Sequence, residues 1–298
     1  RSGRGRARRC APPTGSYNPS TGHIAVRVLD RSARPAAFVP VTISGTASRS
    51  EITNDQGCAF FAFLPAGAYS VVLNSTGYVD RQGAATPSST ANVAIGHVTS
   101  AQFDYDRAAS VVAQFDAEGG LLPNDLPISV GNTSLLPTGM RTFAGTGTTR
   151  TISNLFPSTD GYDLWAGACA DADPEGLDAL GTAYYPNGMR QNPIATLPGG
   201  STSASIVLGQ IRIRLTDAAG NPLPNLSITI SHAADKVCGT GETHTYASTG
   251  SDGTALLAVP YGTWTVTSPG HPSVGGAPTF SVSPVSGAST NLVTAVVQ

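Results

Sequence analysis

The sequence has few charged residues and lacks any long apolar run. Charged residues make up 12% of the chain, against about 25% in an average soluble domain. No stretch approaches the roughly 18 apolar residues of a membrane-spanning helix, and no apolar signal-peptide segment follows the first residues. We therefore expect no membrane span in this chain. The hydrophobic content of 40% is enough for folded cores and argues against general disorder.

Uninterrupted helical segments are also missing. The 34 glycines and 22 prolines break the chain every few residues, which a long helix or coiled coil does not tolerate. The composition therefore predicts a turn-rich, mostly β protein.

Motifs for catalysis and cofactor binding are absent as well. The sequence contains no Gly-x-Ser-x-Gly, His-Glu-x-x-His, Walker loop or dinucleotide fingerprint. Nucleophilic catalysis needs a Ser or Cys beside an oriented base, yet the histidines are scattered through predicted strand edges and loops. They are His23, His97, His232, His244 and His271. We expect a protein that is not an enzyme and that needs no cofactor.

Positive charge is concentrated at the start of the chain. Five of the 17 basic residues lie in the first nine positions, which leaves 12 basic against 19 acidic residues in the other 289. An acidic body repels nucleic acid and anionic membranes, so we expect no nucleic-acid partner. The basic arm itself has three readings: a solvated tail, a polyanion contact, or the flank of a removed anchor.

The four cysteines are widely spaced. Cys10, Cys58, Cys169 and Cys238 form no Cys-x-x-Cys or Cys/His spacing, so a zinc site is not expected. An even set of cysteines in a low-charge, Ser/Thr-rich chain predicts disulfides and an oxidising, extracellular compartment. Four buried free thiols are the alternative. We favour pairing Cys10 with Cys58, and Cys169 with Cys238.

One succession of strands and turns occurs twice. In both copies an alternating strand is followed by a second strand, a Gly-containing turn, a buried strand and a Pro-x-Gly-x-aromatic turn. The first copy uses residues 24–29, 39–43, 54–57, 58–63 and 65–69, and the second uses 211–215, 226–230, 251–253, 254–259 and 260–264. Because side chains alternate along a strand, the aromatic residue two positions after the glycine has a fixed place, where it covers a sandwich end.

The middle of the chain contains a weaker copy, from residue 111 to residue 208. Three similar units of about 90–100 residues fit this pattern better than one large domain. We predict a basic arm at residues 1–16 and three β-sandwiches at residues 17–106, 107–209 and 210–298. The linkers are short, which favours a stiff tandem array.

The turn motifs carry a resemblance to known families. They are Asp55-x-Gly57, Phe60 and Leu64-Pro65-x-Gly67-x-Tyr69-x-Val71, and, near the end, Asp252-Gly253 and Pro260-x-Gly262-x-Trp264-x-Val266. This string resembles carboxypeptidase-regulatory-like, prealbumin-like and collagen-adhesin B-type domains, as found in actinobacterial surface or type IV pilus-associated proteins. The resemblance implies an all-β fold of three tandem immunoglobulin-like antiparallel sandwiches, which serve as stalks, spacers or adhesive modules.

The adhesin B-type domains often contain a Lys–Asn isopeptide bond, which needs a buried lysine. The only lysine here is Lys236, in a predicted loop beside Cys238. We therefore expect no isopeptide bond, and disulfides would supply the covalent stiffening.

One acidic segment has two interpretations. Asp171, Asp173 and Glu175 have the spacing of the first half of an EF-type calcium loop, and Asp178 adds a carboxylate. However, Thr182 stands at the position that normally carries the closing glutamate. The same acids would also cap a two-turn helix that begins near residue 174.

Aromatic residues of the middle region also have two interpretations. Exposed, Tyr162, Trp165 and Tyr184 would form a platform for a carbohydrate or protein ligand. Buried, they would belong to the core.

The combined pattern predicts a non-enzymatic extracellular structural or adhesive protein, a rigid multi-sandwich rod on a bacterial surface or in a pilus-like filament. Its partners would be further copies, other surface or pilus subunits, or a glycan or host ligand. The closing strand, residues 292–297, would offer an edge to a neighbouring subunit. The alternatives are a binding module of a secreted enzyme and a virion or tail decoration protein.

Overall fold

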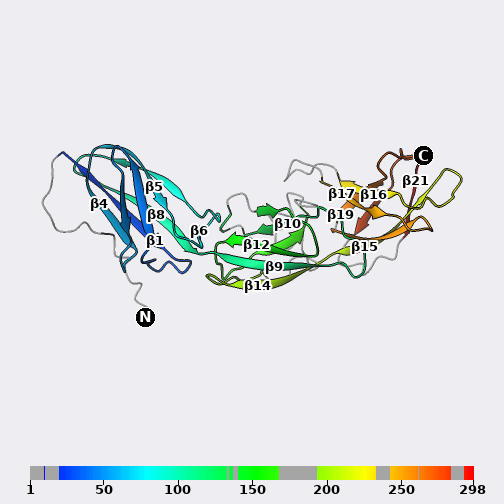
Figure 1. Ribbon diagram of the computed structural model, residues 1–298, viewed down its shortest axis with the longest axis horizontal. Coiled ribbons are helices and arrows are strands. Elements are labelled where there is room, and N and C mark those ends of the chain that lie inside the picture. Colours follow the sequence, from blue (N-terminus) through cyan, green and yellow to red (C-terminus); the bar gives the residue numbers. More distant parts are fainter. Residues whose placement is uncertain are drawn as a thin grey trace. The chain divides into compact units, whose positions relative to one another are not determined.

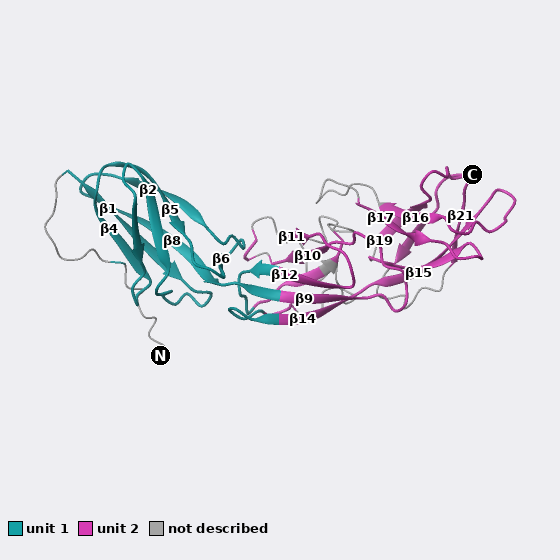
Figure 2. Ribbon diagram, viewed as in Figure 1, with its two compact units in different colours: residues 1–110, 153–159, 196–201 teal, residues 111–152, 160–195, 202–298 magenta. Residues whose placement is uncertain are grey.

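The computed structural model describes residues 10, 20–132, 134–136, 140–167, 193–232, 242–260, 262–282 and 292–298. Every regular element in these ranges is a β-strand (Figure 1). The chain forms two compact units: residues 1–110, 153–159 and 196–201 make up unit 1, and the other residues make up unit 2 (Figure 2). The described residues contain no helix that is long and apolar enough to cross a membrane.

The first sandwich, in unit 1, has two four-stranded sheets, ordered β4-β1-β8-β6 and β3-β2-β5-β7. Its strands are β1 (Gly22–Leu29), β2 (Pro40–Gly45), β3 (Arg49–Ile52), β4 (Cys58–Leu64), β5 (Gly67–Leu73), β6 (Tyr78–Asp80), β7 (Ser88–Val93) and β8 (Val98–Arg107). Strand β1 pairs antiparallel with β4 and parallel with β8. The inward residues of six of these strands close one apolar core between the sheets.

The middle sandwich has two three-stranded sheets, ordered β12-β9-β14 and β11-β10-β13. Its strands are β9 (Ala109–Asp116), β10 (Ile128–Gly131), β11 (Met140–Phe143), β12 (Thr149–Leu155), β13 (Asp163–Ala166) and β14 (Ser201–Val207). Alternate residues of β9, such as Val111 and Ala113, are fully buried.

The third sandwich, in unit 2, repeats the arrangement of the first. Its strands are β15 (Gly209–Thr216), β16 (Ser227–His232), β17 (Glu242–Ser248), β18 (Thr254–Val259), β19 (Gly262–Thr267), β20 (Thr279–Val282) and β21 (Leu292–Val296). The sheet orders are β18-β15-β21 and β17-β16-β19-β20. Strand β15 lies between antiparallel β18 and parallel β21, as β1 lies between β4 and β8, over a separate core. The predicted all-β fold of three sandwiches is therefore confirmed, whereas the predicted domain boundaries stay a prediction.

The Pro-x-Gly-x-aromatic turns behave alike in the first and third sandwiches. Tyr69 and Trp264 are both buried, with 1% and 0% of their surface exposed. The Tyr69 hydroxyl donates to the Pro65 carbonyl at 3.0 Å, and the Trp264 indole N–H donates to the Pro260 carbonyl at 3.0 Å. Each aromatic side chain therefore both fills the core and satisfies a carbonyl of its own turn.

A threonine holds the loop before the buried strand in both sandwiches. Thr53 accepts a hydrogen bond from the Val39 amide at 2.9 Å and donates to the Ala36 carbonyl at 2.7 Å. Thr249 donates likewise to the Leu223 carbonyl at 2.7 Å. A single hydroxyl thus satisfies buried backbone groups that the strands leave unpaired.

Aspartate turns close the first strand of each of these sandwiches. Asp217 accepts from the amides of Ala219 and Asn221, and Asp30 accepts from the amides of Ser32 and Arg34. The Asn221 side chain also donates to Asp217 at 2.8 Å, which lowers the pKa of this exposed carboxyl.

A disulfide joins Cys10 to Cys58, with the Cα atoms 5.7 Å apart. This is the pairing that the sequence favours for these two residues. It ties residue 10 to β4, an edge strand of the first sandwich. Cys169 and Cys238 lie outside the described residues, so their pairing stays a prediction.

Candidate functional site

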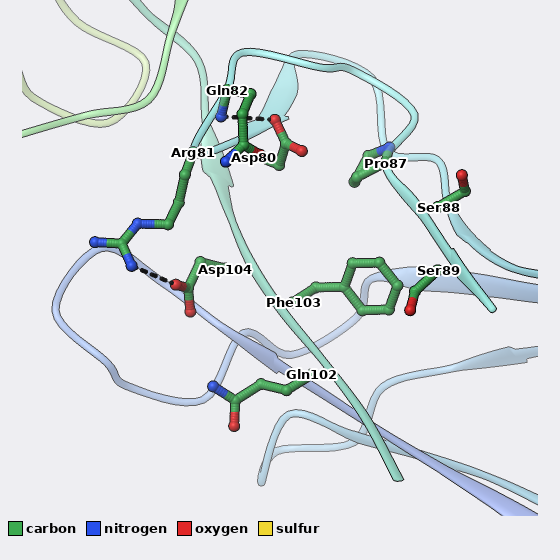
Figure 3. Close-up of a pocket in the computed structure, with 9 residues that line it drawn as sticks. All are labelled: Asp80, Arg81, Gln82, Pro87, Ser88, Ser89, Gln102, Phe103 and Asp104. Carbon is green, nitrogen blue, oxygen red and sulfur yellow. Dashed lines mark hydrogen bonds and ion pairs between the residues drawn. The ribbon is translucent and has the colours of Figure 1, made fainter. Parts of the chain in front are cut away.

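A small polar hollow opens beside β7 and β8 in the first sandwich (Figure 3). Its volume is about 290 Å³, at the lower limit for small-molecule pockets, which are mostly apolar. Seven of its nine lining residues are polar. The lining consists of Asp80, Arg81, Gln82, Pro87, Ser88, Ser89, Gln102, Phe103 and Asp104.

Both carboxylates of the hollow are already engaged. Asp80 accepts from the backbone amides of Gln82 at 3.0 Å and Ala84 at 2.7 Å, as expected for an aspartate that closes a turn. Asp104 forms an ion pair with Arg81 at 3.3 Å (Figure 3). No histidine stands among the lining residues beside Ser88 or Ser89. The hollow can therefore hydrogen-bond a small polar group, but its lining contains no nucleophile–base pair.

The backbone segments on either side of β6 are held by a tyrosine of β8. The Tyr105 hydroxyl accepts from the Ser75 amide at 3.0 Å and donates to the Ala85 carbonyl at 2.7 Å. Burial raises the pKa of Tyr105, so the hydroxyl keeps its proton at neutral pH. This anchoring gives these segments a structural role.

A second polar cluster lies where β17 of the third sandwich meets the loop between β9 and β10. His244 is 1% exposed, and its Nε2 lies 3.0 Å from Glu242 Oε1. Its Nδ1 lies 3.6 Å from Asp125 Oδ1, and its ring packs on Trp264 at 5.6 Å between centroids. Burial, then the charges of Asp125 and Glu242, hold the pKa of Tyr246 well above its ordinary value.

This cluster was not expected from the sequence, in which His244 is one of several scattered histidines. The available signal was the pattern Glu242-x-His244-x-Tyr246, because residues two apart on a strand share one face. That face points into the core here. Within the described residues no group of three or more His, Cys, Asp or Glu side chains is arranged to hold a metal ion. The cluster is therefore a buried polar pairing rather than a metal centre.

Of the two interpretations of the middle-region aromatic residues, the buried one holds for Tyr162. This residue is 1% exposed and its backbone pairs with Ile194, so it belongs to the core and cannot contact a ligand. Trp165 lies in β13 opposite Ser129, and its side chain lies outside what the structure describes, as does Tyr184.

The predicted calcium loop lies outside the described residues. Asp171, Asp173, Glu175 and Asp178 are all affected. Calcium binding at this segment therefore stays a prediction.

Comparisons with known proteins add a structural likeness only. No family model matches the chain, and no curated protein matches it. Among solved structures, it is similar to the Bacillus anthracis TIE protein, with 17% identity over 94% of this chain and 50% of that chain, at a TM-score of 0.27. This chain thus spans about half the length of that protein.

Two pilins are also among the solved structures to which the chain is similar. The major pilin subunit BcpA of Bacillus cereus has 10% identity over 93% of this chain and 99% of that chain, at a TM-score of 0.24. The full-length major pilin SpaD of Corynebacterium diphtheriae has 10% identity over 93% and 98%, at a TM-score of 0.26. At these low TM-scores the likenesses do not indicate a shared function.

Proposed function

We propose that the chain is a non-enzymatic structural protein displayed outside the cell, on a bacterial surface or in a pilus-like filament. The observation that carries the proposal is the junction between the middle and third sandwiches, where the bonded residues all belong to unit 2. At this junction, backbone and side-chain hydrogen bonds join the two sandwiches in addition to the covalent connection of the chain.

Backbone hydrogen bonds cross this junction. The loop after β9 lies along the edge of β18, where the Leu121 amide donates to the Leu256 carbonyl at 2.8 Å. In return, the Ala258 amide donates to the Leu121 carbonyl at 2.9 Å. The loop thus extends a sheet of the third sandwich by one bridge.

A buried glutamine reinforces the same junction. The Gln210 side-chain amide donates to the carbonyls of Ala117 at 3.1 Å and Glu118 at 2.8 Å. Gln210 is the second residue of β15, the first strand of the third sandwich. Its hydrogen bonds therefore fix the two sandwiches to each other close to the point where the chain passes from β14 to β15. An enzyme that closes around a substrate uses hinges with few such bonds, whereas a protein that transmits force benefits from a stiff junction.

The disulfide supports the proposed location. Disulfides persist in oxidising compartments and are reduced in the cytosol. The Cys10–Cys58 bond therefore suits a protein that works outside the cytoplasm. In this setting we propose further copies of the chain, or other surface subunits, as its partners.

The proposal is tested by a thiol-labelling experiment on intact cells that produce the protein, in which amines are also labelled to detect surface exposure. We expect a membrane-impermeant amine reagent to label the protein on intact cells, and Cys10 and Cys58 to resist alkylation until a reductant is added. Recovery of the protein in the cytosolic fraction, with both thiols alkylated directly, would contradict the proposal.

A further inference from the structure

The outward side of the sheet β17-β16-β19-β20 carries almost only hydroxyl side chains. Along these strands every second residue is buried, and the residues between them face outward. The outward residues are Ser227, Thr229, Ser231, Thr243, Thr245, Ala247, Thr263, Thr265, Thr267, Thr279 and Ser281. Ten of these eleven are Ser or Thr, and we call this surface the hydroxyl face.

The strand register arranges these hydroxyls in a grid. Thr229 on β16 lies between Thr245 on β17 and Thr267 on β19, and Thr265 lies beside Thr279 on β20. Neighbouring strands lie about 4.8 Å apart, and alternate residues along a strand about 7 Å. The Oγ1 atoms of Thr229 and Thr245 are 3.2 Å apart. The grid thus repeats in two directions over four strands, three of which are labelled in Figure 1.

None of the eleven outward positions is charged. The opposite sheet of the same sandwich differs, because β15 carries Arg212 and Arg214 among its outward residues. Sheet edges normally carry charged side chains that discourage association, yet the outward residues of the edge strands β17 and β20 are uncharged. Strand propensity alone does not explain the predominance of Ser and Thr at these positions, since it favours Val, Ile and Tyr as much as Thr.

The equivalent face of the first sandwich does not form such a grid. On the sheet β3-β2-β5-β7, the outward positions include Pro40, Ile52, Ala68 and Val72 among the hydroxyl residues. The nearly complete hydroxyl array of the third sandwich is therefore not shared by the first sandwich.

We infer that the hydroxyl face binds an uncharged polysaccharide that lies across the sheet. Ser and Thr hydroxyls both donate and accept hydrogen bonds, as sugar hydroxyls do, and no charge has to be desolvated when they meet. The Thr methyl groups offer apolar contacts to the C–H faces of sugar rings. Each contact is weak, but a polymer repeats them, so binding gains from multivalency.

This inference rests on the proposed display outside the cell, where such polymers are accessible. It also goes beyond a purely structural role, because it assigns the third sandwich a ligand class. Since binding is measured on the purified chain, its outcome does not depend on where the cell places the protein.

The test is binding of the full-length chain to three probes: microcrystalline cellulose, chitin and soluble dextran. Binding to the insoluble probes is measured by co-sedimentation, and binding to dextran by affinity electrophoresis. The comparison distinguishes recognition of a crystalline polysaccharide surface from recognition of a soluble polysaccharide chain. The face variants are Thr229→Val with Thr265→Val, which keeps the β-branched shape, and Thr245→Lys, which adds a charge. Thr294→Val and Thr294→Lys are matched controls, because Thr294 is exposed on β21 of the opposite sheet.

We expect the unmodified chain to bind at least one probe, with an affinity that is unchanged in high salt because no charges are paired. Both face variants should bind about tenfold or more weakly, while the Thr294 controls bind as the unmodified chain does. Absence of binding to all three probes, or face variants that bind as well as the controls, would overturn the inference. Failure of the thiol-labelling experiment with retained binding would instead reject the location alone.

Discussion

Tyr69 and Trp264 illustrate how single side chains hold the turns of this protein. Each buries its ring and donates one hydrogen bond to a proline carbonyl four residues earlier. A buried carbonyl that loses its donor costs free energy because water cannot replace the bond.

We predict that Tyr69→Phe lowers the free energy of unfolding by about 1 kcal/mol, because only the hydroxyl is removed. The measurement is denaturant unfolding of the first sandwich. Tyr78→Phe is the control, since Tyr78 contacts Tyr105 through its ring at 5.5 Å. Equal effects of the two substitutions would refute the role of the Tyr69 hydroxyl.

Gly253 is required by both its backbone angle and its surroundings. Its φ is +70°, and an added Cβ would lie 2.8 Å from the Leu215 carbonyl oxygen. At Gly220, φ is +86° and an added Cβ would meet nothing within 4 Å.

We therefore predict that Gly253→Ala lowers the free energy of unfolding by about 3 kcal/mol or more, because strain and a backbone collision add. Gly220→Ala should cost only about 1 kcal/mol, the penalty of the left-handed conformation. Thermal unfolding of both variants checks this, and a smaller loss for Gly253→Ala than for Gly220→Ala would contradict it.

Tyr246 gives the third sandwich a predictable response to alkali. Its hydroxyl donates to the Ala258 carbonyl at 2.9 Å, and burial holds its pKa well above 10. The folded state thus keeps the proton more tightly than the unfolded state does. The corresponding stability is complete below about pH 10, the unfolded value, and declines as the pH rises further.

We expect Tyr246→Phe to be somewhat less stable at neutral pH, through the lost hydrogen bond, but to lose less stability between pH 10 and pH 11 than the unmodified chain. Denaturant unfolding across this pH range measures the difference. Parallel pH profiles for the two proteins would show that another group controls the alkaline limb.

At the scale of elements, the succession of strands could be predicted where the turns between them are specified by residues close in sequence. The Pro-x-Gly-x-aromatic turns and the Gly57 and Gly253 turns depend on residues close in sequence, so their spacing identified the first and third sandwiches. The hydroxyl face needed the register of four strands, which sequence alone does not fix. The spacing Glu242-x-His244-x-Tyr246 is a local signal for part of the cluster around His244, but the approach of Asp125, more than 100 residues away, could not be predicted from it.

The Cys10–Cys58 disulfide acts on one element, the edge strand β4. It closes a loop with a sequence separation of 48 residues, and loops of this length typically gain about 2–4 kcal/mol from a disulfide.

We predict that the double variant Cys10→Ser with Cys58→Ser loses about this much stability in the first sandwich. The third sandwich should be unchanged, as followed by Trp264 fluorescence in a Trp165→Phe background, because the chain has 2 tryptophans. Denaturant unfolding with and without reductant makes the comparison. A loss of similar size in both sandwiches would mean that the bond acts beyond β4.

At the scale of the whole molecule, each sheet pair has its own interior, and bonds at Leu121 and Gln210 fix the junction within unit 2. Many polar side chains of the described residues close turns or form ion pairs, as Asp80 and Asp104 do. These separate interiors and the bonded junction support the proposed structural role.

Immunogold electron microscopy of intact, unpermeabilised cells tests this account most directly, with an antibody against the third sandwich. The account predicts gold particles on the cell exterior, along the envelope or on filaments that extend from it. Labelling that appears only after permeabilisation, spread through the cytoplasm, would contradict it.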